Sequence, residues 1–121
     1  MFTVNPAQMR RLETQAVDRV VPRVAAHLRT RFPAELRRRS ISEAKLEAFV
    51  REGVSRGQSY GLDQPSEQEL FVVATLLLGP RFDLDGSHPW AGQLLTNPRL
   101  TGFEKTSVLH DHLVFGAGRA R

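Results

Sequence analysis

The longest apolar run of the chain, Leu70 to Leu78, places nine largely apolar residues in succession. By periodicity alone such a run fits a buried strand or a buried helix. A capping-box pattern, Ser66…Glu69, precedes the run and Gly79-Pro80 follows it, and both signals favour a helix. Since a helix that is apolar almost all round belongs at the centre of a domain, we predict a core helix over residues 67–78, on which the others pack.

The segment before this core helix carries the pattern of one long amphipathic helix over residues 6–31. Asn5-Pro6 is typical of an N-cap followed by proline at the first helical position. Pro22 removes a backbone hydrogen bond inside this segment and predicts a kink near Val20 or a break into two helices. Phe32-Pro33 then ends the helix, and a short turn over residues 34–38 is expected. The apolar residues recur at three- and four-residue steps: Met9, Leu12, Ala16, Val17, Val20, Val21, Val24 and Leu28.

A second helix is predicted to open at Ser40, which forms a capping-box pattern with Glu43, or at Ser42. It ends at Tyr60-Gly61, where glycine suits the position after the C-cap. Two glycines inside it, Gly53 and Gly57, lower its helix propensity and are expected to let another helix approach closely. Its apolar face consists of Leu46, Phe49, Val50 and Val54.

Beyond Pro80 the sequence predicts a loop, a short helix over residues 90–95 and a last helix opened by the capping-box pattern Thr101…Glu104. The residues expected to face inward from the last helix are Phe103, Val108, Leu109, Leu113 and Val114. No alternating strand pattern of useful length occurs. We therefore predict an all-α fold, a single small helical bundle of four main helices plus one or two short helices with a kinked first helix. It forms one domain over residues 1–121, ordered over about residues 5–115, with residues 116–121 as a tail.

Composition limits the classes of protein to consider. A length of 121 residues fits one domain, and the absence of cysteine excludes disulfides and thiolate chemistry. The longest apolar run falls short of the about 20 residues that span a bilayer. The N-terminal residues 1–6 lack a basic segment followed by an apolar one, so no signal peptide is expected and we predict a cytoplasmic protein.

Charge is distributed unevenly along the chain. Residues 1–61 hold eleven Arg and one Lys against six acidic residues, a net charge of +6, whereas residues 62–121 hold five basic and seven acidic residues, a net charge of −2. The densest cluster, Arg37-Arg38-Arg39, suits an acidic partner because guanidinium groups form two-pronged contacts with carboxylates. An ordinary solvated helix surface also explains it, and this is the stronger of the two interpretations. Nucleic-acid binding is not expected, since Phe32 is the only aromatic residue near the cluster.

The sequence indicates no catalytic residues, no metal site and no cofactor. His110 and His112 are two residues apart, which on a helix directs them to different faces, whereas metal ligands need a spacing of three or four. The pattern Asp83-Leu-Asp85-Gly86 resembles the start of a calcium loop, but Leu94 stands where the loop needs a glutamate. We interpret it as an aspartate-rich turn. Two aromatic residues, Phe82 and Trp90, either close the end of the bundle or present an anchor to a partner.

Several short segments together resemble a group of small helical proteins that are encoded beside type VI secretion effector and chaperone genes in Proteobacteria. They are Phe49-Val-Arg51, Tyr60-Gly61, Leu78-Gly79-Pro80, Phe82-Asp83 and Pro89-Trp90-Ala91. Usual members carry a longer basic or aromatic run before Tyr-Gly, where this chain has Ser55 to Ser59. The resemblance implies an accessory role, in which a co-chaperone or adaptor helps to load an effector onto the secretion spike.

The first expectation for function is therefore a non-enzymatic factor that binds an effector, an effector chaperone or a spike-tip protein. The second is an immunity protein that neutralises a cognate toxin through its basic half, and the third is a small enzyme. Oligomeric state stays open. The residues expected to contact a partner are Arg37, Arg38, Arg39 and Arg51, followed by Phe82 and Trp90.

Overall fold

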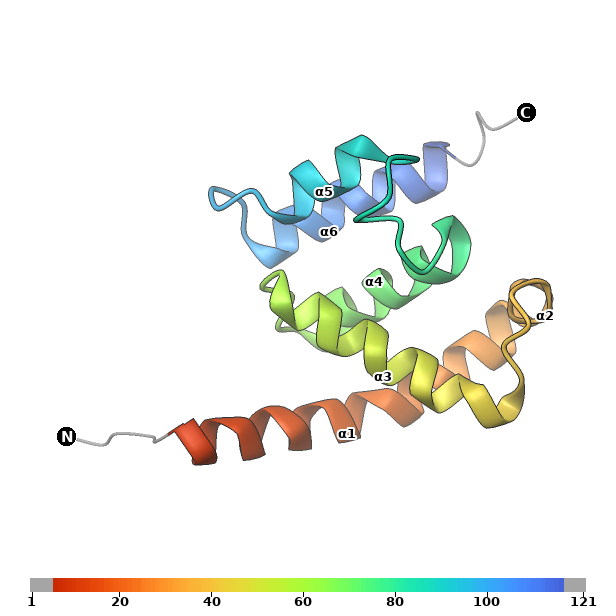
Figure 1. Cartoon of the computed structure of the whole chain (residues 1–121), viewed down its shortest axis with the longest axis horizontal. Helices are drawn as coiled ribbons and strands as arrows, with labels where there is room; N and C mark the ends of the chain where they lie inside the picture. The colour runs from red at the N-terminus through yellow and green to blue at the C-terminus, as the bar shows by residue number, and fades with distance from the viewer. Residues whose placement is uncertain (1–5, 117–121) are drawn as a thin grey trace.

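A computed structural model describes the backbone of residues 6–116 and the side chains of residues 17–114. Within these residues the chain is helical, with no strand, which confirms the all-α prediction. Figure 1 shows the order of the elements along the chain. The helices are α1 (Pro6–Arg31), α2 (Pro33–Arg38), α3 (Glu43–Ser59), α4 (Pro65–Leu78), α5 (Pro89–Leu95), α6 (Gly102–Asp111) and the π-helical segment η1 (His112–Gly116).

Helix α4 lies between two hydrophobic cores and contributes to both. On one side Val72 and Leu76 pack with buried residues of α1, α2 and α3. On the other side Phe71 and Ala74 pack with buried residues of α5, α6 and the connecting loops. The half-buried Val73 contacts both cores. Figure 1 shows α4 in the middle of the molecule, with α1 on one side and α5 and α6 on the other.

Helix α3 approaches α4 closely at Gly53. A Cβ atom on Gly53 would lie 2.8 Å from Val72 Cγ2, so only glycine fits there without movement of a buried, stiff side chain. A Cβ atom on Gly57 would have its nearest neighbours at 3.6 Å, which is ordinary van der Waals contact. The prediction that α3 uses glycine to admit another helix is confirmed at Gly53.

Helix α1 runs through Pro22 as one helix, so the expectation of a break into two helices is wrong, and a bend of its axis stays a prediction. Val21 and Val24 are fully buried on either side of Pro22, and this burial offsets the backbone hydrogen bond that proline removes. The described part of the predicted stripe, from Val17 to Leu28, is buried as expected. The Asn5 cap, the side chains of Met9, Leu12 and Ala16, and the tail beyond Gly116 lie outside the described residues.

Two predicted helix starts need correction. Ser40 has a positive φ of 58° in a turn, and Ser42 is the residue that caps α3. The capping box Ser66…Glu69 is also wrong. Helix α4 begins two residues earlier, because Pro65 takes its first position and Glu67 Oε1 accepts a hydrogen bond of 3.2 Å from the backbone N–H of Gln64. Glu69 consequently takes no part in capping and lies one turn inside the helix.

The capping box at the start of α6 is confirmed, since Thr101 N–H donates to Glu104 Oε1 at 2.9 Å and Glu104 N–H donates to Thr101 Oγ1 at 3.1 Å. The predicted inward face is only partly right. Leu109 and Leu113 are buried, whereas Phe103 is 72%, Val108 40% and Val114 51% exposed. Lys105 takes an inward position instead, burying its aliphatic stem while its amine donates to the Tyr60 carbonyl at 2.8 Å. Residues 33–38 form the helix α2 rather than a turn.

Candidate functional site

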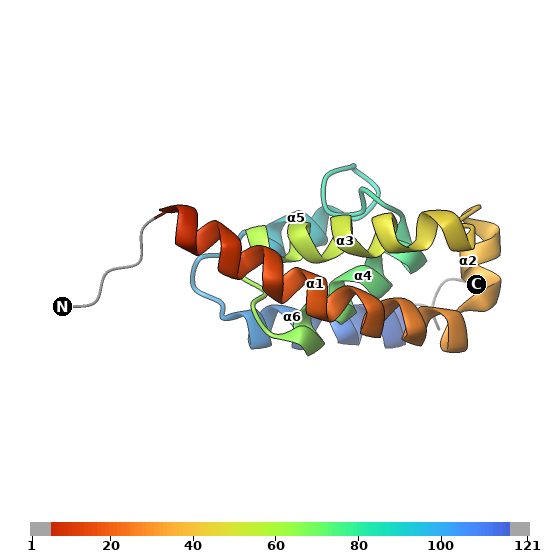
Figure 2. The ribbon, with the colours of Figure 1, turned by 90° about the horizontal axis from the view of Figure 1, so that it is seen from below.

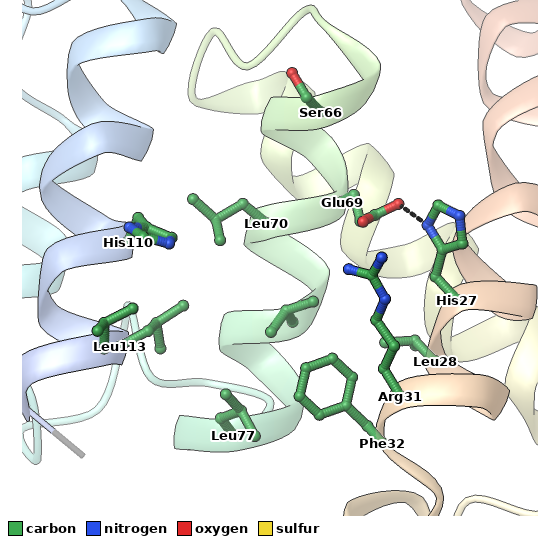
Figure 3. A pocket seen from close by; sticks show the side chains of 12 residues that line it. His27, Leu28, Arg31, Phe32, Ser66, Glu69, Leu70, Leu77, His110 and Leu113 are labelled. Atoms are coloured by element: carbon green, nitrogen blue, oxygen red, sulfur yellow. Dashed lines mark hydrogen bonds and ion pairs between the residues drawn. The ribbon is translucent and has the colours of Figure 1, made fainter. Parts of the chain in front are cut away.

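One face of α4 is not covered by any other helix among the described residues. Ser66, Glu69, Leu70, Val73 and Leu77 recur at helical spacing and lie on this face. Helices α1 and α6 flank it without extensive contact with each other over the part of the chain described. The result is a groove with a cavity volume of about 350 Å³, floored by α4 and walled by α1 and by α6 with η1. Figure 3 shows the side chains of all three elements pointing into it.

The groove corrects the prediction that α4 is packed on all sides. Its residues Phe71, Val72 and Leu76 are buried, as a central helix requires. Leu70 and Val73 are only half-buried, and Leu77 is 36% exposed. Seen from the side of α1, the molecule shows α1 crossing α4 with α3 and α6 on opposite sides (Figure 2). The face of α4 between α1 and α6 stays accessible, because these two helices have no extensive contact with each other over the described residues.

The groove combines an apolar floor with a mostly basic rim. Phe32 of α1 and Leu113 of η1 continue the apolar surface of Leu70, Val73 and Leu77. At the rim the polar groups are Arg31 and His27 from α1, His110 from α6, and Ser66 and Glu69 from α4. Figure 3 shows the guanidinium of Arg31 pointing into the groove. Such a surface suits a ligand that is itself apolar on one side and polar on its flanks.

The single carboxylate on this rim is held by a neighbour. His27 Nδ1 lies 2.6 Å from Glu69 Oε1 (Figure 3), and because an ionised carboxylate only accepts hydrogen bonds, Nδ1 is the donor. A histidine–carboxylate pair also occurs in acid–base catalysis. Within the described residues, however, no hydroxyl is hydrogen-bonded to His27. The arrangement joins α1 to α4 and orients the Glu69 carboxylate toward α1. Arg31 forms no ion pair among the described side chains and is the rim's permanent positive charge.

The accessible surface continues beyond the Ser66 end of this cavity, both toward α1 and toward α6. A hollow of about 210 Å³ shares His27, Ser66 and Glu69 with it and adds Arg23. A more open hollow of about 380 Å³ shares Ser66, Leu70 and His110 and adds the exposed Phe103 with Asp111. The three hollows therefore form one continuous surface along α4 rather than a closed small-molecule pocket.

The predicted basic cluster lies at one end of the groove. Arg39, just after α2, donates from Nε to the Leu76 carbonyl at 2.9 Å and from Nη2 to the Leu77 carbonyl at 3.3 Å. These carbonyls belong to the last turn of α4, where no intrahelical partner exists. Arg39 therefore positions α2 on the C-terminal end of α4, while Arg37 and Arg38 remain exposed on α2.

Arg51, the fourth predicted contact residue, belongs to an ion-pair network instead. Its guanidinium donates to Asp18 of α1 at 2.5 Å and to Glu47 of α3 at 3.3 Å. The hydrogen bond to Asp18, followed by that to Glu47, raises the pKa of Arg51 above its usual value. Arg51 joins α3 to α1, away from the groove, and the structure does not bring it together with Arg37 and Arg38.

Phe82 is fully buried in the core formed by α4, α5 and α6, so its side chain cannot serve as the surface anchor that was predicted as one alternative. The next residue, Asp83, is also buried and accepts hydrogen bonds from Arg56 and from the Tyr60 hydroxyl. Arg56 in addition donates to the Pro80 carbonyl at 2.5 Å. These contacts fix the loop after α4 to the end of α3.

The charges in this network follow from burial and hydrogen bonding. Burial is the largest single influence on Asp83 and opposes its ionisation, but the hydrogen bonds from Arg56 and Tyr60 together hold its pKa below the usual value. Burial, followed by the hydrogen bond to Asp83, raises the pKa of Tyr60 to about 12. The aspartate-rich turn thus contains one structural carboxylate, Asp83, and one exposed carboxylate, Asp85.

Trp90, the remaining predicted contact residue, is half-buried at the start of α5. Its ring stacks on that of His112 with centroids 3.7 Å apart and an interplanar angle of 8°, and His88 approaches it edge-on. Trp90 therefore links α5 to η1 and is separate from the basic residues of α2. Across the described side chains, no group of three or more His, Cys, Asp or Glu is placed to hold a metal ion.

No protein-family model, no curated protein and no solved structure matches the chain. No helix within the described residues is long and apolar enough to span a membrane.

The groove was not predicted from the sequence, although its residues carry a recognisable signal. Ser66 and Glu69 are the polar residues on one face of an otherwise apolar helix, and His27 and Arg31 are one turn apart on α1. A polar border beside an apolar stripe indicates an edge between buried and accessible surface. Only the positions of α1 and α6 show that the two borders face each other.

Proposed function

We propose that this protein is a non-enzymatic binding factor that receives a segment of a partner protein in the groove over α4. Its setting, on the resemblance described above, is type VI secretion, where it would act as a co-chaperone or adaptor for effector loading. The partner would be an effector, an effector chaperone or a spike-tip protein.

The uncovered face of α4 is the observation that carries this proposal. Leu70, Val73 and Leu77 keep apolar surface exposed in the helix that otherwise forms the centre of both cores. Each Å² of such surface that a partner removes from water contributes roughly 25 cal/mol to binding. A surface that follows α4 from Ser66 to Leu77 and widens beyond the Ser66 end fits a polypeptide segment better than a compact metabolite.

Co-expression with the products of neighbouring effector, chaperone and spike-tip genes, followed by size-exclusion chromatography, tests the proposal. We expect one of them to co-elute with the chain, and we expect Leu77→Asp in the groove to abolish co-elution. Leu84→Asp is the matched control, because Leu84 is a leucine 64% exposed in the loop after α4 and does not line the groove. Equal co-elution of both variants would place the binding surface elsewhere.

Toxin neutralisation is separated from effector loading by a rescue assay. We expect the chain alone not to protect cells that express the neighbouring toxin. If the unaltered chain protects the cells and Leu77→Asp does not, the loading role is contradicted and the groove is the binding site of an immunity protein.

A further inference from the structure

We infer that the groove binds an amphipathic α-helix of a partner, with an apolar stripe on α4 and acidic residues at the end that reaches Arg31 and α2. This inference rests on the proposed function, since it names the chemistry of the segment bound at the same site. The helical conformation of the partner segment, its apolar stripe and its acidic end are each inferred from a separate property of the groove.

The dimensions of the floor favour a helix. From Ser66 to Leu77 the face of α4 extends for about 16 Å, the length of a three-turn helix of about 11 residues. Leu70, Val73 and Leu77 are spaced three and four residues apart, which matches the ridges of an apposed helix. An extended segment has less to bind, because the described residues form no sheet edge that could supply backbone hydrogen bonds.

The distribution of charge selects an acidic segment. Arg31 lines the cavity near its Leu77 end, whereas Glu69, the one carboxylate of the cavity, points toward His27 of α1. Arg39 holds α2 against the last turn of α4, so the exposed Arg37 and Arg38 lie on the element at the Leu77 end. Asp111 lies in the hollow at the Phe103 end. The acidic residues of the partner helix therefore belong at the Leu77 end.

A designed peptide tests both parts of the inference without knowledge of the natural partner. The probe is a fluorescein-labelled helical peptide of about 18 residues, with leucine at successive a and d positions, glutamate at the flanking positions of one end and uncharged residues at those of the other end. A second peptide carries lysine in place of every glutamate, and a third carries glutamine in place of every leucine. By fluorescence anisotropy we expect the acidic peptide to bind at least about tenfold more tightly than either control.

Matched variants locate the binding. Leu77→Asp is expected to weaken binding of the acidic peptide by about tenfold or more, and Leu84→Asp by less than about twofold. Arg31→Glu is expected to shift the preference toward the lysine peptide, because it reverses the charge of the rim. Glu52→Arg, a charge reversal of equal size on an exposed residue of α3 that does not line the groove, is expected to leave the preference for glutamate intact.

Nuclear magnetic resonance on the unaltered protein makes the result independent of how any variant folds. We expect the acidic peptide to shift amide resonances of α4 and of the facing residues of α1 and η1. Shifts confined to other helices, or equal binding of the glutamate and lysine peptides, would overturn the inference. So would a dimer of the chain that Leu77→Asp dissociates, since a second copy would then occupy the groove.

Failure of the inference is distinguishable from failure of the proposed function. If the peptides do not bind but the co-eluting partner is still lost in Leu77→Asp, the groove binds a segment of other chemistry and this inference is wrong. If co-elution is also insensitive to Leu77→Asp, the proposed site itself is wrong.

Discussion

Two sides of α4 carry similar apolar residues, but one side is buried and the other is partly exposed. Toward α3, Val72 packs against a glycine and Leu76 is fully buried. Toward the groove, Val73 and Leu77, the next residues in sequence, remain partly accessible. The difference therefore lies in the neighbours that the fold supplies and not in the hydrophobicity of α4. On this comparison, the closed side provides stability, and the open side is the one that we propose for binding.

The sharpest test substitutes the adjacent leucines. Leu76→Ala is expected to lower the free energy of unfolding by about 3 kcal/mol, because it leaves a cavity in a closed core. Leu77→Ala is expected to cost only about 1 kcal/mol, because the groove already admits water. Urea denaturation followed by circular dichroism measures both. Equal losses would show that the groove face is as important for stability as the closed face.

Asp83 holds the loop that follows α4 to α3. Removing the Asp83 carboxylate should therefore lower the free energy of unfolding. Asp83→Ala is expected to cost about 2 kcal/mol, because it leaves the partly buried Arg56 without its carboxylate. Asp85→Ala in the same loop is the control and is expected to change stability by about 0.5 kcal/mol or less. A similar loss in both variants would mean that the loop, rather than the buried ion pair, is what matters.

A third test addresses the contact between α3 and α4 directly. Gly53→Ala forces a methyl group against Val72, and this strain should exceed the gain in helix propensity, for a net loss of about 1 kcal/mol. Gly57→Ala has room and should stabilise the protein by about 0.5 kcal/mol. Thermal unfolding of the pair gives the comparison, and a stabilised Gly53→Ala protein would contradict the close packing described here.

A fourth test concerns pH and acts only in alkaline solution. The folded protein keeps the Tyr60 proton to about pH 12, whereas the unfolded chain releases it near pH 10. Between these values the folded state binds more protons, so the free energy of unfolding should fall as the pH rises from 10 to about 12. Tyr60→Phe should lack this part of the decline. Phenolate absorbance reports the titration directly, since the chain has one tyrosine, and a midpoint near 10 would contradict it.

The sequence predicted the parts of the fold that are decided locally. The capping box at Thr101 and the helix ends at Gly61 and Gly79 depend on residues near one another in sequence. The use of Gly53 was predictable because a glycine inside a helix is itself a local signal, although its contact, Val72, belongs to another helix. Where two local signals competed, the prediction failed, as at Ser66, where Pro65 begins the helix earlier. The inward face of α6 failed for a related reason, because hydrophobicity alone does not identify a lysine that buries its stem.

The candidate site was predicted less well, because it is formed by helices that are distant in sequence. Among the predicted contact residues, Arg37 and Arg38 are exposed on α2, whereas Arg39 and Arg51 hold helices together and Phe82 is buried. An arginine looks the same in sequence whether it binds a partner or the carbonyl of a neighbouring helix. The apolar residues of α4 likewise do not indicate how many helices surround it.

The stacked pair of Trp90 and His112 gives the molecule an internal optical probe. His112 belongs to η1, whose next residue, Leu113, forms part of the groove wall. Indole emission depends on what lies against the ring, and a protonated imidazole at stacking distance quenches it. Since the chain has a single tryptophan, movement of η1 away from α5 would change the fluorescence of the unlabelled protein. Loading of the groove could then be followed in solution without any added dye.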